Sequence, residues 1–498
     1  MSRLAPRPLG ERIPRRLHAV SCSLPTMEDV IGYETRDPAI LNHVCSGYPR
    51  FVVHDLIRQL AALWSRRLDL GSNVVWLTAS RRAAEELAVY LNPVTSRILE
   101  HEGIWGLAHS ENPEVAQRAR QFLQHTGGFL SSRQAEDQLV KAGLLDPEPE
   151  DSIPNDAHRI IRDTFGSDLD YAQPDSIILT NSGMNAIYRA FQAASDYQRT
   201  RGRTIWIQLG WLYLDTMAVI EKLGNGPGNR RVITSVEDLE TLRSVVTECG
   251  AQLAGLVTEA PSNPLIQTPD LEIVADIVRS AGGLVIIDPS VASAYNVDVF
   301  PHADLVVTSL TKYAAWEGDV IAGAILVGDD CPQADQFRAD LARNTDPLYN
   351  RDAARLAFQI GRAPEITREI DRQAREVAAF LENQPGVERV YWAEAEDQLA
   401  NFRKLLRPGG GPGALLTIDL AGPLESFYDR VTLPKGPSFG ITTSLLCPFL
   451  YLAHYDLVST DQGRDHLKSN NLNPELVRLS IGTEPIDAIL ASLDEALT

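Results

Sequence analysis

Between about residues 156 and 330, short apolar runs alternate with amphipathic helical patterns. One such pattern is Leu271, Val274, Ala275 and Val278, which has the i, i+3, i+4, i+7 spacing of a helix covering one sheet face. Apolar strands that alternate with such helices indicate a mostly parallel central sheet with helices on both faces, which is an α/β fold. The strands are predicted at residues 176–179, 204–208, 253–258, 284–287, 304–307 and 320–327.

The pattern differs on both sides of this region. Residues 1–60 are punctuated by prolines and predict an arm with short helices, and residues 61–155 predict a polar, mostly helical inserted segment that ends in an acidic linker. We assign no chemistry to residues 92–155. Residues 331–498 predict a smaller α+β domain, with helices at 364–383 and 485–497 and strands at 387–391 and 414–420.

Composition excludes several classes of protein. The formal net charge of −20 argues against a nucleic-acid-binding surface. No apolar run approaches the roughly 20 residues that span a bilayer, so no membrane contact is expected. The five cysteines are scattered and the ten histidines show no ligand spacing, which predicts neither disulfides nor a metal site and favours the cytoplasm.

The stretch Ser309-Leu310-Thr311-Lys312 follows one apolar run, and Asp288 follows another. In open parallel sheets, the carboxyl ends of the strands face the ligand crevice. A lysine among hydroxyls, with an aspartate one crossover away, suits a cofactor that forms a Schiff base and carries a pyridinium nitrogen. Taken alone, the stretch fits an ordinary surface lysine equally well.

Three more strand ends carry candidate ligand contacts, each with a plainer alternative. Ser182-Gly183-Met184 opens a helix and could bind a phosphate with its backbone N–H groups, or simply form a helix cap. Tyr213 could stack on a flat ring or pack in the core. Asn263 lies between two prolines and could bond a phenolic oxygen or serve only as a turn residue.

Two arginines also suggest anion binding. Arg478 lies in an apolar strand-like run, where it requires an anion, either a substrate α-carboxylate or an internal carboxylate. Tyr48-Pro49-Arg50 places a phenol and a guanidinium two residues apart, which suits a phosphate clamp, although a surface turn fits the same residues.

Taken in order, these motifs resemble the cystathionine γ-synthase/γ-lyase group of fold-type I pyridoxal 5′-phosphate (PLP) enzymes, whose fold is like that of aspartate aminotransferase. The length of the insertion and the motifs at residues 18–21 and 446–448 resemble the longer fungal-type branch. The matching segments are Y-x-R at 48–50, S-G-M-x-A-I at 182–187, P-S-N-P at 261–264, Asp288, S-x-T-K-Y at 309–313 and R-L-S-I-G-x-E at 478–484.

The resemblance implies roles for these residues. Lys312 would carry PLP and move protons, Asp288 would pair with the pyridine nitrogen, and Tyr213 would stack on the ring and assist catalysis. The substrate would be held by Arg478, Ser438 and Asn263. The remaining cofactor contacts would be Ser182, Gly183, Met184, Asn263, Ser309 and Thr311, with Tyr48 and Arg50 reaching the phosphate of a neighbouring subunit in a homodimer or homotetramer.

The implied reaction is γ-replacement on an O-acylated homoserine by a thiol such as cysteine, which forms cystathionine in transsulfuration and methionine biosynthesis. Alternatives are a cystathionine γ- or β-lyase, an O-acylhomoserine sulfhydrylase, or an enzyme of specialised metabolism with another nucleophile. Departures from the family pattern bear on this choice, because Thr443 stands where many members carry a glutamate linked to reaction type.

Overall fold

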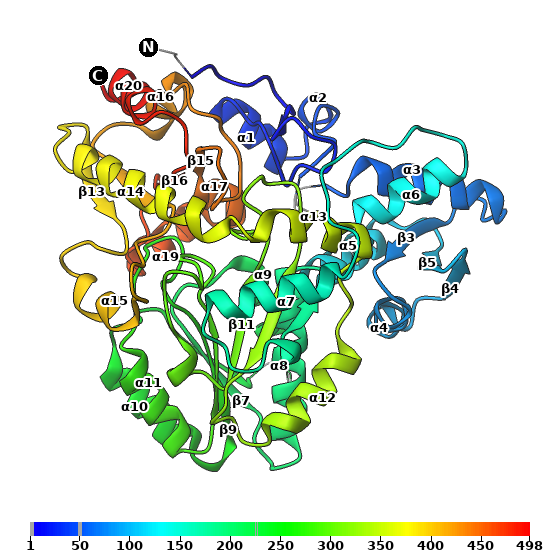
Figure 1. The fold of residues 1–498 in the computed structure, drawn as a ribbon, viewed down its shortest axis with the longest axis horizontal. Coiled ribbons are helices and arrows are strands. Elements are labelled where there is room, and N and C mark those ends of the chain that lie inside the picture. Colours follow the sequence, from blue (N-terminus) through cyan, green and yellow to red (C-terminus); the bar gives the residue numbers. More distant parts are fainter. Residues whose placement is uncertain (1–3, 48–51, 225, 227) are drawn as a thin grey trace.

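The computed structural model describes residues 4–47, 52–224, 226 and 228–498 (Figure 1). Its centre is a seven-stranded sheet with the order β6-β12-β11-β10-β9-β7-β8. All neighbouring strands pair in parallel except β12, which is antiparallel to both β11 and β6. The strands are β6 (Ile178–Thr180), β7 (Ile205–Leu209), β8 (Arg230–Ile233), β9 (Leu253–Glu259), β10 (Leu284–Asp288), β11 (Leu305–Ser309) and β12 (Gly323–Val327).

Helices cover both faces of this sheet because successive residues of each strand point to opposite sides. In β10, Leu284 and Ile286 pack with the helices of one face, whereas Val285 and Ile287 pack with those of the other. The first face carries α8 (Gly183–Arg199), α9 (Leu214–Lys222) and α12 (Ala334–Asn344). The second carries α7 (Ala157–Asp168), α10 (Leu239–Cys249), α11 (Leu271–Ser280) and α13 (Asn350–Ile360).

The mostly parallel α/β architecture is therefore confirmed, and all six predicted strands are present. Strand β8 was not predicted, because its sequence begins with Arg230 and Arg231 and shows no apolar run. It lies at the edge of the sheet, where only one neighbour, β7, orders it.

The C-terminal region forms a four-stranded antiparallel sheet with the order β13-β14-β16-β15. Its strands are β13 (Val387–Tyr391), β14 (Leu415–Leu420), β15 (Leu445–Pro448) and β16 (Val477–Ser480). The two long predicted helices are present as α14 (Ala363–Leu381) and α20 (Ile486–Leu497). The other helices are α15 (Leu399–Leu405), α16 (Leu424–Arg430), α17 (Phe449–Ala453), α18 (Tyr455–Val458) and α19 (Asp461–Ser469).

The N-terminal arm packs against this C-terminal region of its own chain. Met27 and Val30 of the arm join the core of that region, and the Tyr428 hydroxyl donates to the Leu24 carbonyl oxygen at 2.7 Å. The arm contains β1 (Arg12–Ile13), β2 (Ser21–Cys22), α1 (Met27–Glu34) and α2 (Pro38–Leu41).

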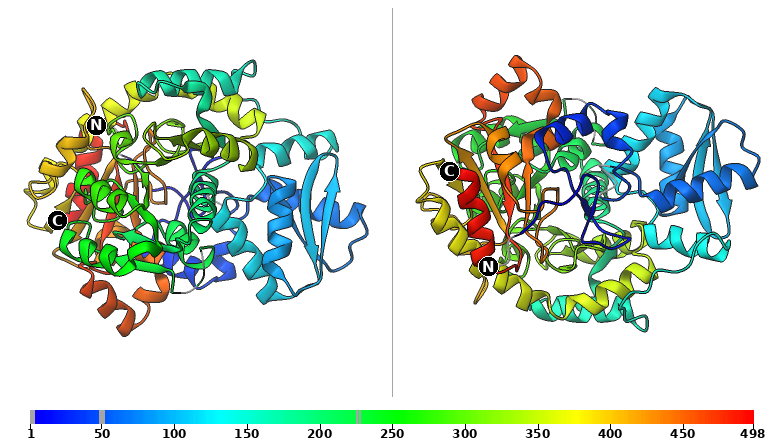
Figure 2. Two further views of the ribbon diagram at one scale, coloured as in Figure 1. Left: turned by 90° about the horizontal axis from the view of Figure 1, so that it is seen from below. Right: turned by 90° about the horizontal axis from the view of Figure 1, so that it is seen from above.

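The inserted segment projects from one end of the molecule as a compact α/β unit (Figure 2). Its helices are α3 (Asp55–Arg67), α4 (Arg81–Leu91), α5 (Pro113–Thr126) and α6 (Ser132–Lys141). They pack around an antiparallel sheet of β3 (Val74–Thr78), β5 (Ile104–His109) and β4 (Ser96–His101). The prediction of a mostly helical segment missed the β4–β5 hairpin, whose two-residue turn places Glu102 and Gly103 at positive φ.

No helix among the described residues is both long enough and apolar enough to cross a bilayer.

Candidate active site

A cavity of about 220 Å³ lies where the carboxyl ends of the central strands meet the C-terminal region. Every predicted site residue that the structure describes lines this cavity. These residues are Ser182, Gly183, Met184, Tyr213, Asn263, Asp288, Ser309, Thr311, Lys312, Ser438 and Arg478. Tyr48 and Arg50 lie outside the described residues, although the flanking Gly47 and Val53 line this cavity.

Lys312 follows β11, at the point where the strand turns into the cavity. Its Nζ atom donates to the Ser438 hydroxyl at 3.0 Å and lies 4.6 Å from the centre of the Phe439 ring. Burial, together with the positive charge of Arg478, lowers the pKa of Lys312 well below its usual value. A neutral amine at this position can accept a proton from a bound substrate.

Two backbone positions that hold Lys312 are in the left-handed region. Tyr313 has φ +58° and Ser438 has φ +100°, which is strained for residues with side chains. Tyr313 is fixed because its N–H donates to the Gly440 carbonyl at 2.9 Å and its hydroxyl donates to the Val291 carbonyl at 2.6 Å. Strain that is held by the surrounding packing is characteristic of residues that position a functional group.

Asp288 and Glu259 are paired in register at the ends of β10 and β9. Burial raises the pKa of Asp288 to about 6, although the Ser290 N–H donates to its carboxylate at 2.8 Å. Burial and the neighbouring Asp288 raise the pKa of Glu259 well above its usual value. Asp288 forms no ion pair with any described residue, so a cationic ring nitrogen would stabilise its ionised form.

The residues around Ser182, at the start of α8, could form a cradle for a phosphate. The Ser182 hydroxyl accepts from the Asn185 N–H at 3.1 Å, which caps the helix. A Cβ atom on Gly183 would lie 2.8 Å from the Cβ of Ser309, so only glycine leaves this approach open. The cradle therefore combines a helix N-terminus, which favours anions, with the nearby Ser309 hydroxyl.

Thr311 lines the cavity, but its hydroxyl is already bonded to the backbone of Ala322. It accepts from the Ala322 N–H at 3.0 Å and lies 3.3 Å from the Ala322 carbonyl oxygen, to which it donates. As placed, it has no proton left for a phosphate, whereas Ser309 makes no side-chain hydrogen bond with any described residue. The predicted contact of Thr311 with a phosphate is thus less well supported than that of Ser309.

Arg478 lies on β16, 7% exposed, and faces the cavity that Lys312 also lines. Its guanidinium stacks over Phe439 and Phe449, with ring-centre distances of 5.5 and 4.9 Å. Its polar contacts are long, at 3.4 Å to Asn263 Oδ1 and 3.5 Å to the Ser438 carbonyl oxygen. No described carboxylate pairs with it, so the internal salt bridge considered from the sequence is absent there.

Sequence reasoning missed other residues that build this site. Glu259 belongs to the same E-A-P-S-N-P turn as Asn263, and its Oε1 accepts from the Tyr213 N–H at 2.6 Å. Ser290 is an uncharged residue that positions its neighbour: its hydroxyl accepts a hydrogen bond from the Ser309 N–H at 2.8 Å. The inserted segment also lines the cavity, through Gln124 and Gly127 among others, and no local pattern identifies such residues.

The residues present fit PLP. Gly183 and Ser182 would hold the phosphate, Asp288 has no cationic partner among the described residues, and Lys312 is a buried amine beside Arg478. The phosphate, the ring nitrogen and the aldehyde of the cofactor would each find a partner among these residues.

Known proteins of similar sequence span nearly the whole chain. L-2-amino-4-chloropent-4-enoate dechlorinase/desaturase of Streptantibioticus cattleyicolor is 38% identical over 97% of this chain and 96% of its own. Cystathionine γ-synthase of Neurospora crassa is 24% identical over 99% of this chain and 98% of its own. The resemblance to the fungal branch is therefore confirmed, and a bacterial protein shares the same long architecture.

Solved structures and a family model agree on the fold. Cystathionine γ-synthase of Xanthomonas oryzae pv. oryzae, in complex with aminoacrylate and cysteine, has a TM-score of 0.56 at 22% identity and covers 64% of this chain and 80% of its own. The model of the Cys/Met metabolism PLP-dependent enzymes matches residues 168–498. The chain therefore belongs to the family of Cys/Met metabolism PLP-dependent enzymes.

Proposed function

We propose that this enzyme removes a leaving group from the γ carbon of a small L-α-amino acid. The observation that carries the proposal is Arg478, a buried guanidinium that lines the cavity and has no carboxylate partner among the described residues. A buried cation requires an anion, and the α-carboxylate of an amino acid would supply it. Asn263 and Ser438 border the same position.

Lys312 would perform the proton transfers. PLP, when bound, withdraws electrons from the substrate's α carbon. The amine of Lys312 is available as a base because burial and Arg478 lower its pKa, and it would accept the proton from the α carbon and move protons at the β carbon. Ser438, 3.0 Å from Nζ, would orient this amine, and Tyr213 would cover the ring and assist.

The rest of the cavity favours a neutral γ substituent. Aromatic and aliphatic side chains, including Phe439, Phe449 and Ala453, form much of its wall. The other described arginine of the wall, Arg133, is occupied by Glu150 and Asp352, with its Nη1 atom 2.9 Å from Asp352 Oδ1. A second carboxylate on the substrate, such as that of a succinyl ester, would lose its hydration without gaining a partner among the described residues.

A small halide fits these requirements, and the relative that is 38% identical is named for a chlorinated amino acid, L-2-amino-4-chloropent-4-enoate. Chlorine lies on the γ carbon of that compound. Loss of hydrogen chloride would remove one carbon-bound proton and the chloride ion, and would convert the chloroalkene to an alkyne. We propose this class of substrate, a γ-halogenated unsaturated amino acid, as the first to test.

The second candidate is γ-replacement on an O-acylated homoserine by a thiol such as cysteine, which forms cystathionine for methionine biosynthesis. The cystathionine γ-synthase relatives support it, because they share the family and the full length of the chain. Lyase and sulfhydrylase reactions use the same residues and remain alternatives within it.

Product analysis separates these reactions. The holoenzyme would be incubated with the chlorinated amino acid, O-acetylhomoserine, O-succinylhomoserine and cystathionine, each with and without cysteine. The proposal predicts chloride release without any need for cysteine. Cystathionine formation as the fastest reaction would favour the second candidate, and keto acid formation from cystathionine would favour a lyase.

Location and assembly complete the proposal. All five cysteines are free, which supports a cytoplasmic enzyme. The family resemblance implies a homodimer or homotetramer with an active site shared between subunits. The contacts that the inserted segment makes at the cavity are relevant to whether a second subunit is needed.

A further inference from the structure

The inserted segment contains a second copy of the turn that forms the phosphate cradle. Leu77-Thr78-Ala79-Ser80 joins β3 to α4, just as Leu179-Thr180-Asn181-Ser182 joins β6 to α8. In each copy the serine is the helix N-cap, and its hydroxyl accepts at 3.1 Å from the N–H three residues later. The threonine hydroxyl donates to the serine carbonyl oxygen at 2.9 Å in the first copy and 2.8 Å in the second.

The first copy lacks the features that hold a phosphate. Arg81 and Arg82 stand where the second copy has Gly183 and Met184. Arg81 turns to Glu85, 2.7 Å away, and Arg82 bonds Asn344 at 2.5 Å, so both are used in structural contacts. The two turns therefore share their local geometry, but only the second leaves room for a phosphate.

Both copies are joined through Asp346, which is 1% exposed. One oxygen of its carboxylate accepts from the Ser80 hydroxyl, and the other accepts from Asn185 Nδ2 at 2.6 Å. Arg189 pairs with the same carboxylate at 3.2 Å. The degenerate turn is thus anchored directly to the helix that begins at the working cradle.

The end of α5 lies between the two turns. The Ala79 N–H donates to the Gly128 carbonyl at 2.9 Å, and Asn181 Nδ2 donates to the Gly127 carbonyl at 2.7 Å. A Cβ atom on Gly127 would lie 2.2 Å from the Ser182 hydroxyl oxygen, which shows how closely the segment approaches the cradle. One turn earlier, Gln124 Nε2 donates to Asp215 at 2.8 Å in the cavity wall.

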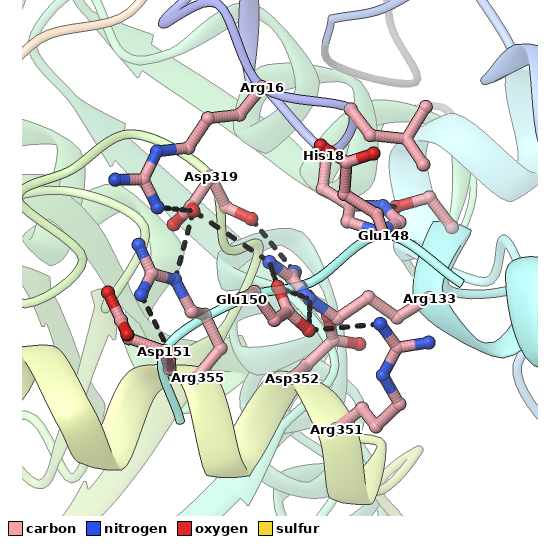
Figure 3. A network of polar contacts seen from close by, with 12 residues as sticks. Arg16, His18, Arg133, Glu148, Glu150, Asp151, Asp319, Arg351, Asp352 and Arg355 are labelled. Atoms are coloured by element: carbon pink, nitrogen blue, oxygen red, sulfur yellow. Dashed lines mark hydrogen bonds and ion pairs between the residues drawn. The ribbon is translucent and has the colours of Figure 1, made fainter. Parts of the chain in front are cut away.

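A buried ionic network fixes this arrangement to the arm and to the body of the same chain (Figure 3). Arg133, which is 1% exposed, pairs with Glu150 and Asp352 and donates to the Asp319 carbonyl at 2.8 Å. From the arm, His18 contacts Glu136 at 3.0 Å. The acidic linker that follows is held by Arg355, which donates to the Asp151 carbonyl at 2.8 Å, so the C-terminal end of the segment is anchored as well.

We propose that residues 74–133 are a degenerate copy of the cradle unit that completes the active site from within the same chain. One chain then contains a whole catalytic site, in contrast to the shared site that the family resemblance implies. The inference depends on the cofactor and its lysine, and it does not depend on the substrate proposed above.

Mixing two full-length variants tests this. In Lys312→Ala the lysine is lost, and in Gly127→Val the added side chain displaces Ser182, which should weaken PLP binding at least about tenfold. Gly143→Val is the matched control, because Gly143 lies in the inserted segment and also has positive φ, but a side chain there would meet no atom within 4 Å. If Gly127→Val does not fold by circular dichroism, Gly127→Ala replaces it.

The two variants carry different tags, are co-expressed and are purified through both tags. Borohydride then traps PLP on Lys312 of the Gly127 variant, and mass spectrometry measures the trapped fraction. The proposal predicts that this fraction stays at the low level of the Gly127 variant alone, or that no mixed assembly forms and the wild type traps PLP as a monomer. Recovery to the wild-type fraction in the mixed assembly would overturn it, as would normal trapping by a folded Gly127→Val protein.

Discussion

Glu259 and Asp288 stand side by side at the carboxyl ends of two parallel strands, and both line the active-site cavity. Glu259 also accepts a hydrogen bond from the backbone of Tyr213, so the carboxyl pair is tied to the predicted stacking residue. No described cation balances this pair, which makes the apo cavity sensitive to pH and suited to a positively charged ring.

The free energy of unfolding of the apo protein should vary with pH because of the Asp288 carboxyl group. Its pKa rises from 3.8 to about 6 on folding, so the folded state binds the proton more tightly than the unfolded state. The resulting stability is present at low pH and is lost as pH rises through the window between these values. Asp288→Asn should reduce this loss in urea unfolding experiments, whereas Asp276→Asn, at an exposed site, should not. An unchanged pH dependence in Asp288→Asn would show that Asp288 titrates normally.

Gly183→Ala should weaken PLP binding about tenfold to a hundredfold, which corresponds to ~1.4–2.8 kcal/mol. The reason is the contact of 2.8 Å that the new Cβ would make with Ser309. Titration of the apo enzyme with PLP, followed by absorbance, measures the dissociation constant. Gly361→Ala is the control, because a Cβ there would meet no atom within 4 Å. Equal affinity in Gly183→Ala and wild type would place the phosphate elsewhere.

Arg478→Met should have two separable effects. KM should rise at least about tenfold, because the buried partner of the α-carboxylate is lost. The acidic limb of the pH–rate profile should also move to higher pH, because removal of the positive charge raises the pKa of Lys312. Arg372→Met, at an exposed helix position, should change neither quantity. A KM increase without any shift in the limb would mean that Arg478 does not influence the titration of Lys312.

Apart from Arg478, the described cavity wall offers no arginine that is free to pair with a substrate carboxylate, and this makes a prediction about homoserine esters. If both are turned over, O-acetylhomoserine should have a kcat/KM at least about tenfold higher than O-succinylhomoserine, because the succinyl carboxylate finds no partner among the described residues of the wall. The two esters share the same reacting carbon and differ in the terminal carboxylate. Steady-state kinetics decides the point, and a preference for the succinyl ester would require a cation that the described wall lacks.

Much of this architecture could be predicted from the sequence because local patterns encode it. Apolar runs identified six strands of the central sheet, and the charged or hydroxyl residues after them proved to line one cavity. Lys312, Asp288 and Arg478 were recognisable because each places a charge at an apolar strand, where a partner is required.

Other parts depend on contacts between distant segments. Gln124 and Gly127 reach the cavity because the inserted segment docks on the body of the chain, through Arg133 and its carboxylate partners among other contacts. No periodicity in residues 92–155 reveals that docking. Strand β8 likewise forms because β7 offers an edge to pair with. Such features arise from tertiary packing, which the pattern of a single segment does not contain.

The most direct test of the proposed function is the rate of chloride release from the proposed γ-halogenated substrate, measured with wild type and Lys312→Ala loaded with PLP. We predict steady chloride release by the wild type and, for Lys312→Ala, a rate lower by at least about a thousandfold, because the base that moves the protons is gone. Absence of chloride release from the wild-type holoenzyme would contradict the proposed reaction. Equal rates in the two proteins would contradict the role of Lys312.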